Sequence, residues 1–275
     1  LITGATGTLG RAFARLCTER DLNFRLLTRA ELDIADARSI ERAVDRYEPW
    51  AIINTAGYVR VDEAENDVER CFRENTHGPA TLAAVCARYG IGLVTFSTDL
   101  VFDGERDAPY VENDETQPIN VYGRSKAEAE KRVLDRHPES LVVRTSSFFG
   151  PWDEHNFITL ALRALKSGQP FVASGDLTVS PTYVPDLVNQ CLDLLIDREQ
   201  GIVHLTNGDA VTWADLAQRA AERADVDTAS LRICRNHRSR LIAPRPRFSA
   251  MRSRRTFSMP TLDDALNRYM QQAAS

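Results

Sequence analysis

The chain has 275 residues, of which 43% are hydrophobic and 27% charged, and it carries a formal net charge of −5. No apolar run approaches the roughly 20 residues that cross a bilayer, so we expect a cytoplasmic protein without a membrane partner. Five cysteines without C-x-x-C spacing and five scattered histidines argue against a disulfide framework, and we predict no metal site.

Short apolar runs alternate with amphipathic stretches over the first 145 residues, which is typical of βαβ units around a parallel sheet. The apolar runs are continuous, as expected for strands that are buried on both faces. We predict strands at residues 1–3, 24–27, 51–53, 91–96 and 141–143, and helices at 9–20, 39–47, 68–89 and 122–137. This pattern predicts an α/β fold with a doubly wound parallel sheet in residues 1–150.

The pattern changes after Gly150-Pro151, where connections that contain Pro and Gly separate predicted helices at 157–166, 184–196 and 213–224. We expect residues 151–275 to form mainly a smaller substrate-binding lobe, with residues 201–205 returning to the main sheet as a strand. The chain does not begin with Met, and its first predicted strand is shorter than the usual length of about five residues. We therefore expect a trimmed chain or a segment of a longer polypeptide.

A glycine-rich turn, Thr3-Gly4-Ala5-Thr6-Gly7-Thr8-Leu9-Gly10, follows the first strand and opens a helix, which is the context of a dinucleotide-binding motif. Gly4 permits the tight turn, Gly7 lets the backbone approach a pyrophosphate, and Gly10 lets the helix pack closely on the strand. The helix N-terminus then presents free N–H groups to the phosphates. The alternative is a tight turn without a ligand. The predicted cofactor contacts in this turn of a Rossmann domain are Gly4, Thr6, Gly7, Thr8, Leu9 and Gly10.

The end of the second strand carries Arg29 where NAD-binding domains place an acidic residue against the ribose 2′-hydroxyl. A cation there suits a 2′-phosphate, so NADP(H) is favoured over NAD(H), unless Arg29 is a solvated surface residue. Asp33 is placed to accept a hydrogen bond from the adenine amino group. Asn75, on a later helix, is either a cofactor contact or a surface amide. The remaining predicted cofactor contacts are Ile34, Asn54, Ala56, Gly57 and Ser97.

Tyr122 and Lys126 are four residues apart on a predicted helix and therefore share one face. A free tyrosine has a pKa of about 10, which a nearby ammonium lowers, so that Tyr122 becomes a usable proton donor. Thr98 follows the fourth strand, at the edge where α/β sheets bind ligands. Lysine is scarce, with three lysines against 31 arginines, which favours a functional Lys126 over an ordinary exposed one. We predict a nicotinamide-dependent enzyme that acts on a carbonyl or alcohol.

Residues 232–255 contain nine arginines in an otherwise acidic chain. One interpretation is a solvated, loosely ordered segment, and another is a nucleic-acid contact. The arginines do not alternate with aromatic residues, so we predict no nucleic-acid partner. Arg245 is instead placed to pair with a diphosphate, whose geometry suits the guanidinium group.

Together these motifs resemble the extended short-chain dehydrogenase/reductase superfamily and, within it, the dTDP-4-dehydrorhamnose reductase family of sugar-nucleotide reductases. The resemblance runs from Thr3 to about Ser253. Its main motifs, beside the glycine turn, are Ser97-Thr98-Asp99-x-Val101-Phe102-Asp103-Gly104 and Tyr122-Gly123-x-Ser125-Lys126-x-x-x-Glu130. Further matches are Val61-Asp62-x-Ala64-Glu65, Val143-Arg144-Thr145-Ser146, Asn156-Phe157, Ser180-Pro181-Thr182, Gly201-Ile202-x-His204-Leu205 and Arg245-Pro246-x-x-Ser249.

The resemblance implies hydride transfer from NAD(P)H to the C4 keto group of a nucleotide-linked 6-deoxy sugar. Tyr122 then protonates the forming alkoxide, Lys126 tunes Tyr122 and binds the nicotinamide ribose, and Thr98 donates a hydrogen bond to the carbonyl oxygen. The substrate contacts that the resemblance implies are Thr98, Asp99, Leu100, Ser147, Asn156 and Arg245. The resemblance is also compatible with a homodimer.

Three residues depart from the family pattern. Members usually carry Tyr at Leu100, Trp at Ser147 and Gln at Leu177, so the sugar pocket of this chain has lost two aromatic walls and an amide. Related dehydratases carry a proton-transferring Glu at the position of Leu100, so dehydration is disfavoured. Two alternatives stay open from the sequence: a sugar-nucleotide epimerase, which needs the same Tyr and Lys, and a non-catalytic NADP-binding module that regulates or is fused to another enzyme.

Overall fold

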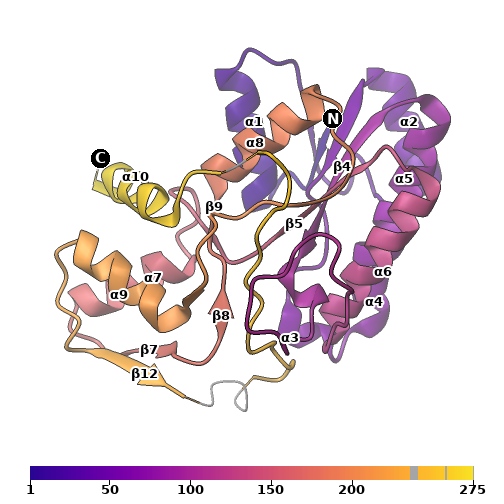
Figure 1. Cartoon of the computed structure of the whole chain (residues 1–275). Helices are drawn as coiled ribbons and strands as arrows, with labels where there is room; N and C mark the ends of the chain where they lie inside the picture. The colour runs from indigo at the N-terminus through magenta and orange to yellow at the C-terminus, as the bar shows by residue number, and fades with distance from the viewer. Residues whose placement is uncertain (236–240, 258, 275) are drawn as a thin grey trace.

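The computed structural model describes residues 1–235, 241–257 and 259–274. Figure 1 shows a sheet covered by helices, with a smaller lobe beside it that carries α7, α9 and α10. The predicted arginine-rich run is only partly covered, since Arg238 and Arg240 lie outside the described residues. Within the described part of the chain, no helix is long and apolar enough to cross a membrane.

The main sheet consists, within the described residues, of six parallel strands in the order β10-β5-β4-β3-β1-β2. Their bounds are β1 (Ile2–Thr3), β2 (Leu26–Leu27), β3 (Ala51–Asn54), β4 (Gly92–Thr98), β5 (Leu141–Thr145) and β10 (Gly201–His204). The strand order reverses between β1 and β3, which creates the crevice where such sheets bind ligands. The predicted α/β fold with a doubly wound parallel sheet is confirmed.

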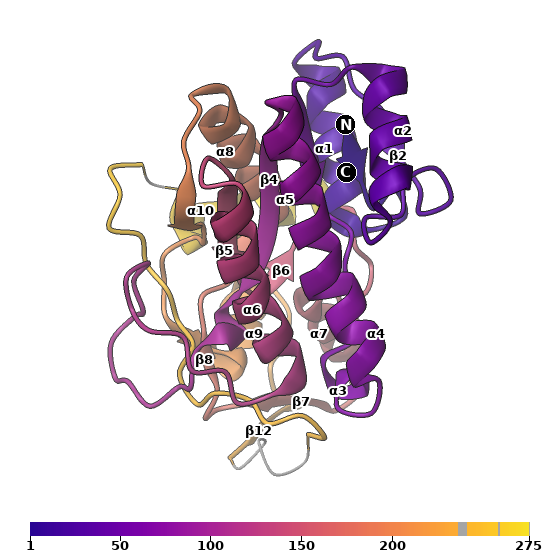
Figure 2. The same cartoon turned by 90° about the vertical axis from the view of Figure 1, so that its right-hand side faces the viewer.

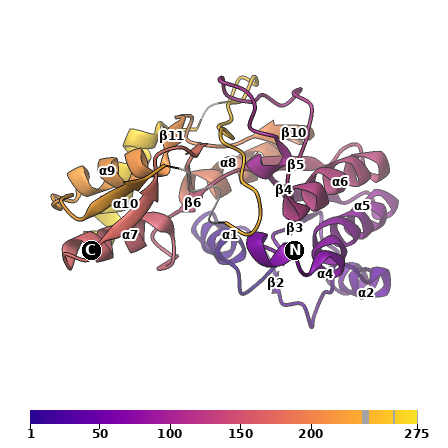
Figure 3. The same ribbon diagram turned by 90° about the horizontal axis from the view of Figure 1, so that it is seen from below.

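Helices cover both faces of this sheet (Figure 3). On one face, α1 (Thr8–Glu19) and α8 (Val184–Ile196) bury side chains such as Phe13 and Leu187 against the strands. On the other face, α2 (Ala37–Tyr47), α5 (Gly78–Tyr89) and α6 (Val121–Arg136) bury Ile40, Leu82 and Val133. Burial of each such side chain contributes roughly 1.5–3 kcal/mol, which fixes the helices that carry the site.

The helix predicted over residues 68–89 is interrupted. It consists of α4 (Val68–Phe72), a π-helical segment η1 (Arg73–His77) and α5, and Figure 2 shows α4 continuing the line of α5. The wider turn rotates Asn75 and Thr76 to the interior, where both are completely buried. The Thr76 hydroxyl donates to the Ser125 carbonyl at 2.6 Å and so joins this helix to α6.

The smaller lobe has its own core around Phe149, Tyr183, Leu216 and Tyr269. Its helices are α7 (Phe157–Lys166), α9 (Trp213–Arg223) and α10 (Leu262–Ala274), of which α10 is absent from the sequence prediction. Its paired strands are β6 (Phe148–Phe149) with β9 (Thr182–Tyr183), β7 (Phe171–Ser174) with β12 (Leu231–Cys234), and β8 (Thr178–Val179) with β11 (Val211–Thr212). Because α8 and β10 lie with the main sheet, the chain passes repeatedly between the two parts, and a boundary near residue 150 stays a prediction.

Candidate active site

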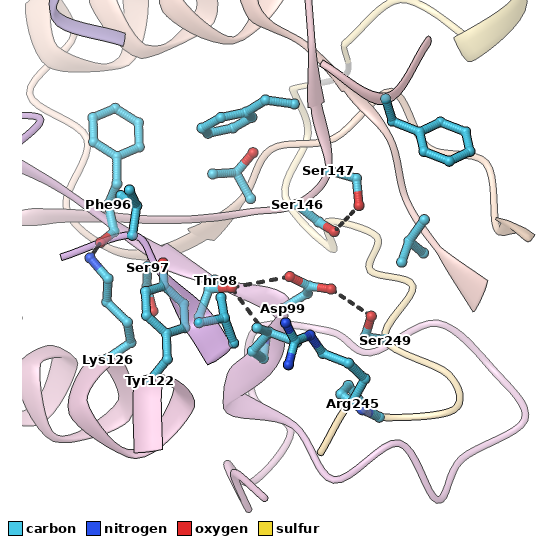
Figure 4. A pocket seen from close by; sticks show the side chains of 18 of the residues that line it. Phe96, Ser97, Thr98, Asp99, Tyr122, Lys126, Ser146, Ser147, Arg245 and Ser249 are labelled. Atoms are coloured by element: carbon cyan, nitrogen blue, oxygen red, sulfur yellow. Dashed lines mark hydrogen bonds between the residues drawn. The ribbon is translucent and has the colours of Figure 1, made fainter. Parts of the chain in front are cut away.

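A pocket of about 550 Å³ lies at the carboxyl ends of the sheet strands, between the sheet and the lobe. Figure 4 shows its labelled side chains. Thr98 ends β4, Tyr122 lies on α6, and Arg245 comes from the segment after the undescribed residues. The pocket therefore joins residues that are far apart in the sequence, at the edge where α/β sheets bind ligands.

The glycine turn is shaped by close backbone packing. Gly4 has φ +76°, and a Cβ there would lie 2.7 Å from Thr55 Oγ1. A Cβ on Gly10 would collide with the Gly4 carbonyl oxygen, whereas one on Gly7 would have only that oxygen nearby, at 3.4 Å. Gly7 caps α1 without a side-chain hydrogen bond, and the first turn of α1 carries no acidic residue. The Ala5 and Gly7 N–H groups donate to the Leu27 and Gly4 carbonyls, and the N-terminus of α1 is left for a pyrophosphate, whose binding here stays a prediction.

Asn54 ties three strands together beneath the turn. Its carboxamide accepts from Thr3 Oγ1 at 2.8 Å and donates to Thr95 Oγ1 at 3.2 Å. Only 2% of Asn54 is exposed, although it contributes to the pocket lining together with Ala56 and Gly57. The structure thus gives Asn54 a bracing role in addition to its predicted place at the cofactor.

Asn75 lies behind the pocket wall rather than on it. Its carboxamide accepts from the Tyr58 N–H at 2.8 Å and donates to the Tyr58 carbonyl at 3.0 Å and to Ser125 Oγ at 3.1 Å. A Cβ on Gly57 would lie 2.9 Å from Asn75 Oδ1, which explains the glycine. The alternative of a surface amide is wrong, because Asn75 is completely buried, and we assign it to holding the Gly57 loop.

The region predicted to hold the adenine end of the cofactor is dominated by charge pairs. Arg29 is 57% exposed at its side chain and donates to Glu74 Oε1 at 2.8 Å, while its Nε lies 3.6 Å from Asp33 Oδ2. Asp33 also accepts from Arg73 at 2.7 Å. Ile34, predicted as a cofactor contact, is 6% exposed and packs in the helical layer that covers this face of the sheet.

Helix α6, which carries Tyr122 and Lys126, is fixed at its first turn by two side chains. Asn120 caps α6, its Oδ1 accepting from the Gly123 N–H at 2.7 Å, and Glu65 accepts from the Val121 N–H at 2.8 Å. A Cβ on Gly123 would collide with the Leu100 carbonyl oxygen, so the glycine lets α6 approach the end of β4. These contacts place Tyr122 and Lys126 in the pocket.

The electrostatics of the predicted pair differ from the expectation. Burial, followed by the Asp99 carboxylate, raises the pKa of Tyr122, and a hydrogen bond with Thr98 opposes this only partly. Lys126 Nζ lies 5.9 Å from the Tyr122 ring centroid and donates to the Phe96 carbonyl at 3.1 Å. Burial lowers the pKa of Lys126 to about 8. The expected lowering of the Tyr122 pKa by the ammonium is therefore wrong for this structure, since burial and the Asp99 charge raise that pKa and only the hydrogen bond with Thr98 lowers it.

Asp99 lies beside this pair and is only 6% exposed. Its carboxylate accepts from Thr98 Oγ1 at 3.1 Å and from Ser249 Oγ at 2.5 Å, as Figure 4 shows. Burial raises the pKa of Asp99, although the hydrogen bonds from Ser249, Ser146 and Thr98 oppose the rise. Asp99 thus anchors the lobe segment around Ser249 to the end of β4.

The predicted substrate side is largely apolar. Leu100, Ser147 and Leu177 all line the pocket, and the hydroxyls of Ser146 and Ser147 are 3.0 Å apart. Ser147 has φ +48°, the left-handed region that is uncommon for residues with a side chain. Two leucines and a serine thus stand at the three positions where the family pattern places aromatic rings and an amide, while Phe148, Phe157 and Trp213 also line the pocket.

Two predicted substrate contacts have different surroundings. Arg245 lines the pocket, and its guanidinium donates to Asp62 Oδ1 at 3.2 Å and to the Ala243 carbonyl at 2.7 Å. Asn156 lies outside the pocket lining. It is 4% exposed and caps α7, its Oδ1 accepting from the Thr159 N–H at 3.0 Å. The predicted substrate contact at Asn156 is corrected to a helix cap.

Sequence reasoning missed the supporting residues of the site. Asp62 accepts from the Ala243 N–H at 2.9 Å and so fixes the segment of Arg245. Asn120 donates to the Pro244 carbonyl at 2.8 Å, which joins the same segment to the start of α6. The signals were present, since Asp62 and Glu65 belong to a noted motif and an Asn before an amphipathic stretch is a typical helix cap.

Three buried polar atoms in the described chain have no hydrogen-bond partner, and one of them belongs to a residue that lines the pocket. Ser97 Oγ is buried at the pocket wall and has no hydrogen-bond partner within the described chain. Such an atom is costly unless a ligand or water satisfies it. The space around Gly7 and the unpartnered Ser97 hydroxyl both fit a dinucleotide bound at the glycine turn. Among the described residues, no group of three or more His, Cys, Asp or Glu side chains is arranged to hold a metal ion.

The comparisons with known proteins decide the family. The model of the RmlD substrate binding domain matches residues 1–274. The chain belongs to this family. Its predicted place among the dTDP-4-dehydrorhamnose reductase-like members of the extended short-chain dehydrogenases is thereby confirmed.

Individual members of the RmlD family are similar along most of the chain. A dTDP-4-dehydrorhamnose reductase from Mycolicibacterium smegmatis is 36% identical over 259 residues, covering 93% of this chain and 78% of the relative. A dTDP-4-keto-6-deoxy-D-glucose reductase from Streptomyces niveus is 35% identical over 252 residues, covering 91% of this chain and 87% of the relative. The crystal structure of dTDP-4-dehydrorhamnose reductase from Bacillus anthracis in complex with NADP superimposes with a TM-score of 0.93 at 28% identity, covering 98% of both chains.

Proposed function

We propose that the protein is an NADP(H)-preferring reductase of a nucleotide-activated 4-keto-6-deoxy sugar. The observation that carries this proposal is the meeting of Tyr122, Thr98 and Lys126 in one pocket with the residues beside the glycine turn. Leu9 in the first turn of α1 and Asn54 at the end of β3 line the same pocket, so a dinucleotide on the turn reaches the catalytic side chains. The RmlD family of reductases supports the same reaction.

The chain's own residues supply acid catalysis and charge stabilisation. Bound NADPH supplies the hydride that the C4 carbonyl carbon accepts. Tyr122 donates a hydrogen bond to the carbonyl oxygen and transfers its proton as negative charge develops there. The Thr98 hydroxyl, which donates to Asp99 Oδ1 in this structure, turns to donate to the same carbonyl oxygen when the sugar binds. Because burial raises the pKa of Tyr122, the proton is held at neutral pH until the carbonyl oxygen becomes basic. The Lys126 ammonium then stabilises the tyrosinate that remains.

The nucleotide part of the substrate is assigned to the lobe side of the pocket. Arg245 is 19% exposed at its side chain and faces the pocket, so it is available to a diphosphate through the rest of its guanidinium group. The sugar itself meets Leu100, Ser147 and Leu177. The relatives reduce different 4-keto sugars by name, so the wall formed by these three residues is where we place the choice of sugar.

The test is turnover with NADPH and a panel of dTDP-4-keto-6-deoxy sugars, followed by the absorbance of the reduced nicotinamide. The proposal predicts oxidation of NADPH that disappears in Tyr122→Phe. Tight NADPH binding without turnover on any sugar would instead leave a non-catalytic binding module. Interconversion of sugars without net NADPH oxidation would identify an epimerase.

The predicted homodimer, the cytoplasmic location and the origin of the chain as a segment of a longer polypeptide stay predictions. We propose the homodimer as the state of the active enzyme. Light scattering of the purified protein at several concentrations tests it, since a dimer has twice the 30.8 kDa mass of the chain.

A further inference from the structure

The adenine end of the predicted cofactor site contains a cation at the place where a 2′-phosphate binds. Leu27 pairs with Thr3 in the sheet, and the Ala5 N–H donates to the Leu27 carbonyl at 3.3 Å. The chain therefore leaves β2 directly beside the glycine turn, and Arg29 follows two residues later. A cation at this position discriminates the 2′-phosphate of NADP from the 2′-hydroxyl of NAD.

Arg29 is not a free cation, because Glu74 binds it. Arg29 Nη1 donates to Glu74 Oε1 at 2.8 Å, and Arg70 Nε donates to the same oxygen at 3.0 Å. The Glu74 side chain is 14% exposed, whereas that of Arg29 is 57% exposed. Glu74 is thus the more enclosed partner, and it holds the guanidinium from the side of η1.

The position of Glu74 is fixed by its neighbour in the π-helical segment. Asn75 is completely buried and is hydrogen-bonded to both backbone groups of Tyr58 and to Ser125. Because this residue cannot turn without breaking those contacts, the backbone of Glu74 stays beside Arg29. The ion pair is therefore part of a braced wall rather than a chance surface contact.

A 2′-phosphate and a 2′-hydroxyl meet this pair differently. A phosphate dianion on Arg29 approaches the Glu74 carboxylate and competes with it for the guanidinium N–H groups, and like charges at such distances repel. A ribose hydroxyl carries no charge and does not meet this repulsion. Glu74 therefore weakens NADP(H) binding while leaving NAD(H) binding nearly unchanged.

We propose that Glu74 is a specificity-determining residue that reduces the preference for NADP(H) over NAD(H) which Arg29 would otherwise confer. This inference rests on the nicotinamide cofactor of the proposed function. It concerns the binding ratio of the two cofactors and is independent of which sugar is reduced.

The test is the Kd of NADPH and of NADH for the wild type and for Glu74→Gln, measured by titration calorimetry without substrate. Glutamine keeps an oxygen that accepts from Arg29 but removes the charge. We expect the Kd of NADPH to fall about three- to tenfold and that of NADH to change less than about twofold. The fragments 2′,5′-ADP and 5′-AMP should show the same contrast, since they carry only the adenine end.

Two controls make the result specific. Glu63→Gln removes the same charge from an exposed pair with Arg60 at 2.9 Å, and it should leave both constants unchanged. In the Arg29→Gln background, Glu74→Gln should favour NADPH less than it does in the wild type, because Arg29 is no longer released and only the repulsion by Glu74 and its pair with Arg70 are removed. Melting temperatures of all variants establish that they are folded.

Three results would overturn the inference: equal changes in both constants, no change in either, or weaker NADPH binding in folded Glu74→Gln. Failure of the proposed function is a separate outcome. If the wild type binds NADPH but reduces no sugar, the reductase is refuted while the shifted ratio still supports the role of Glu74. If the wild type binds neither cofactor, both proposals fall together.

Discussion

The two sides of the pocket are built in different ways. On the sheet side, polar side chains are buried and paired within the protein, as the hydrogen bonds of Asn54, Asn75 and Asp99 show. On the lobe side, the pocket is lined mainly by apolar groups, among them Leu177 and the rings of Phe157 and Trp213, and Val172 is 49% exposed. Hydride and proton transfer require fixed atoms, whereas an apolar wall changes with little consequence for the fold. Under the proposed function, the sheet side sets the reaction and the lobe side sets the sugar.

The largest effect is expected on the sheet side. Tyr122→Phe removes the proton donor and should lower kcat about 10²- to 10⁴-fold, while the Kd of NADPH changes little. Steady-state kinetics and cofactor titration measure both quantities. Tyr89→Phe is the matched control, since its hydroxyl contacts only exposed Asp45 among the described residues, and it should retain full activity. Retained turnover in Tyr122→Phe would contradict the assignment.

The pH profile tests Lys126 on the same side. Its pKa is lowered by burial to about 8, so the ammonium is present below that pH and is lost as the pH rises through it. We expect kcat to fall above about pH 8, because the neutral amine no longer stabilises the tyrosinate. A profile that stays flat well above pH 8 with saturating substrates would contradict the role of the ammonium.

A moderate effect is expected where the lobe meets the nucleotide. Arg245→Ala should raise KM for the nucleotide sugar about tenfold or more and leave kcat closer to the wild-type value, because a charge-assisted contact is lost in binding. Arg247→Ala is the control, since Arg247 is exposed and pairs with Asp107 outside this pocket. If both substitutions raise KM equally, the net positive charge of this region, and not a specific contact of Arg245, determines binding of the nucleotide sugar.

The smallest effect is expected from the apolar wall. Leu177→Gln restores the amide of the family pattern and should change the ratio of kcat/KM between two 4-keto sugars by about three- to tenfold. The Kd of NADPH should stay constant, because Leu177 lies on the lobe side. If the substitution alters cofactor binding but not the sugar ratio, the division of the pocket into two sides is wrong.

Local sequence signals predicted much of this molecule. The glycine turn, the helix at 157–166 and the helix at 184–196 coincide with the structure, because turn chemistry and apolar periodicity act within a few residues. The pairing of Arg29 with Glu74 joins residues 45 positions apart and depends on a π-helical turn that no periodicity revealed. Asn156 was misassigned because a helix cap and a ligand contact use the same side chain.

The raised pKa of Tyr122 is a further property that the sequence did not predict. A lysine one helical turn away indicated a lowered value, but the sequence contains no measure of burial, and the Asp99 charge reaches Tyr122 only through the fold. Short-range pairs such as Tyr122 and Lys126 are therefore predictable in position, while their electrostatics follow from the completed pocket.

The most direct test of the central claim is to follow isotope from NADPH that carries deuterium at the transferable position. With a dTDP-4-keto-6-deoxy sugar, the account predicts deuterium at C4 of the product alcohol, in an amount equal to the NADPH oxidised, and none with Tyr122→Phe in the same reaction time. Conversion of the sugar with the deuterium retained on the cofactor would contradict it.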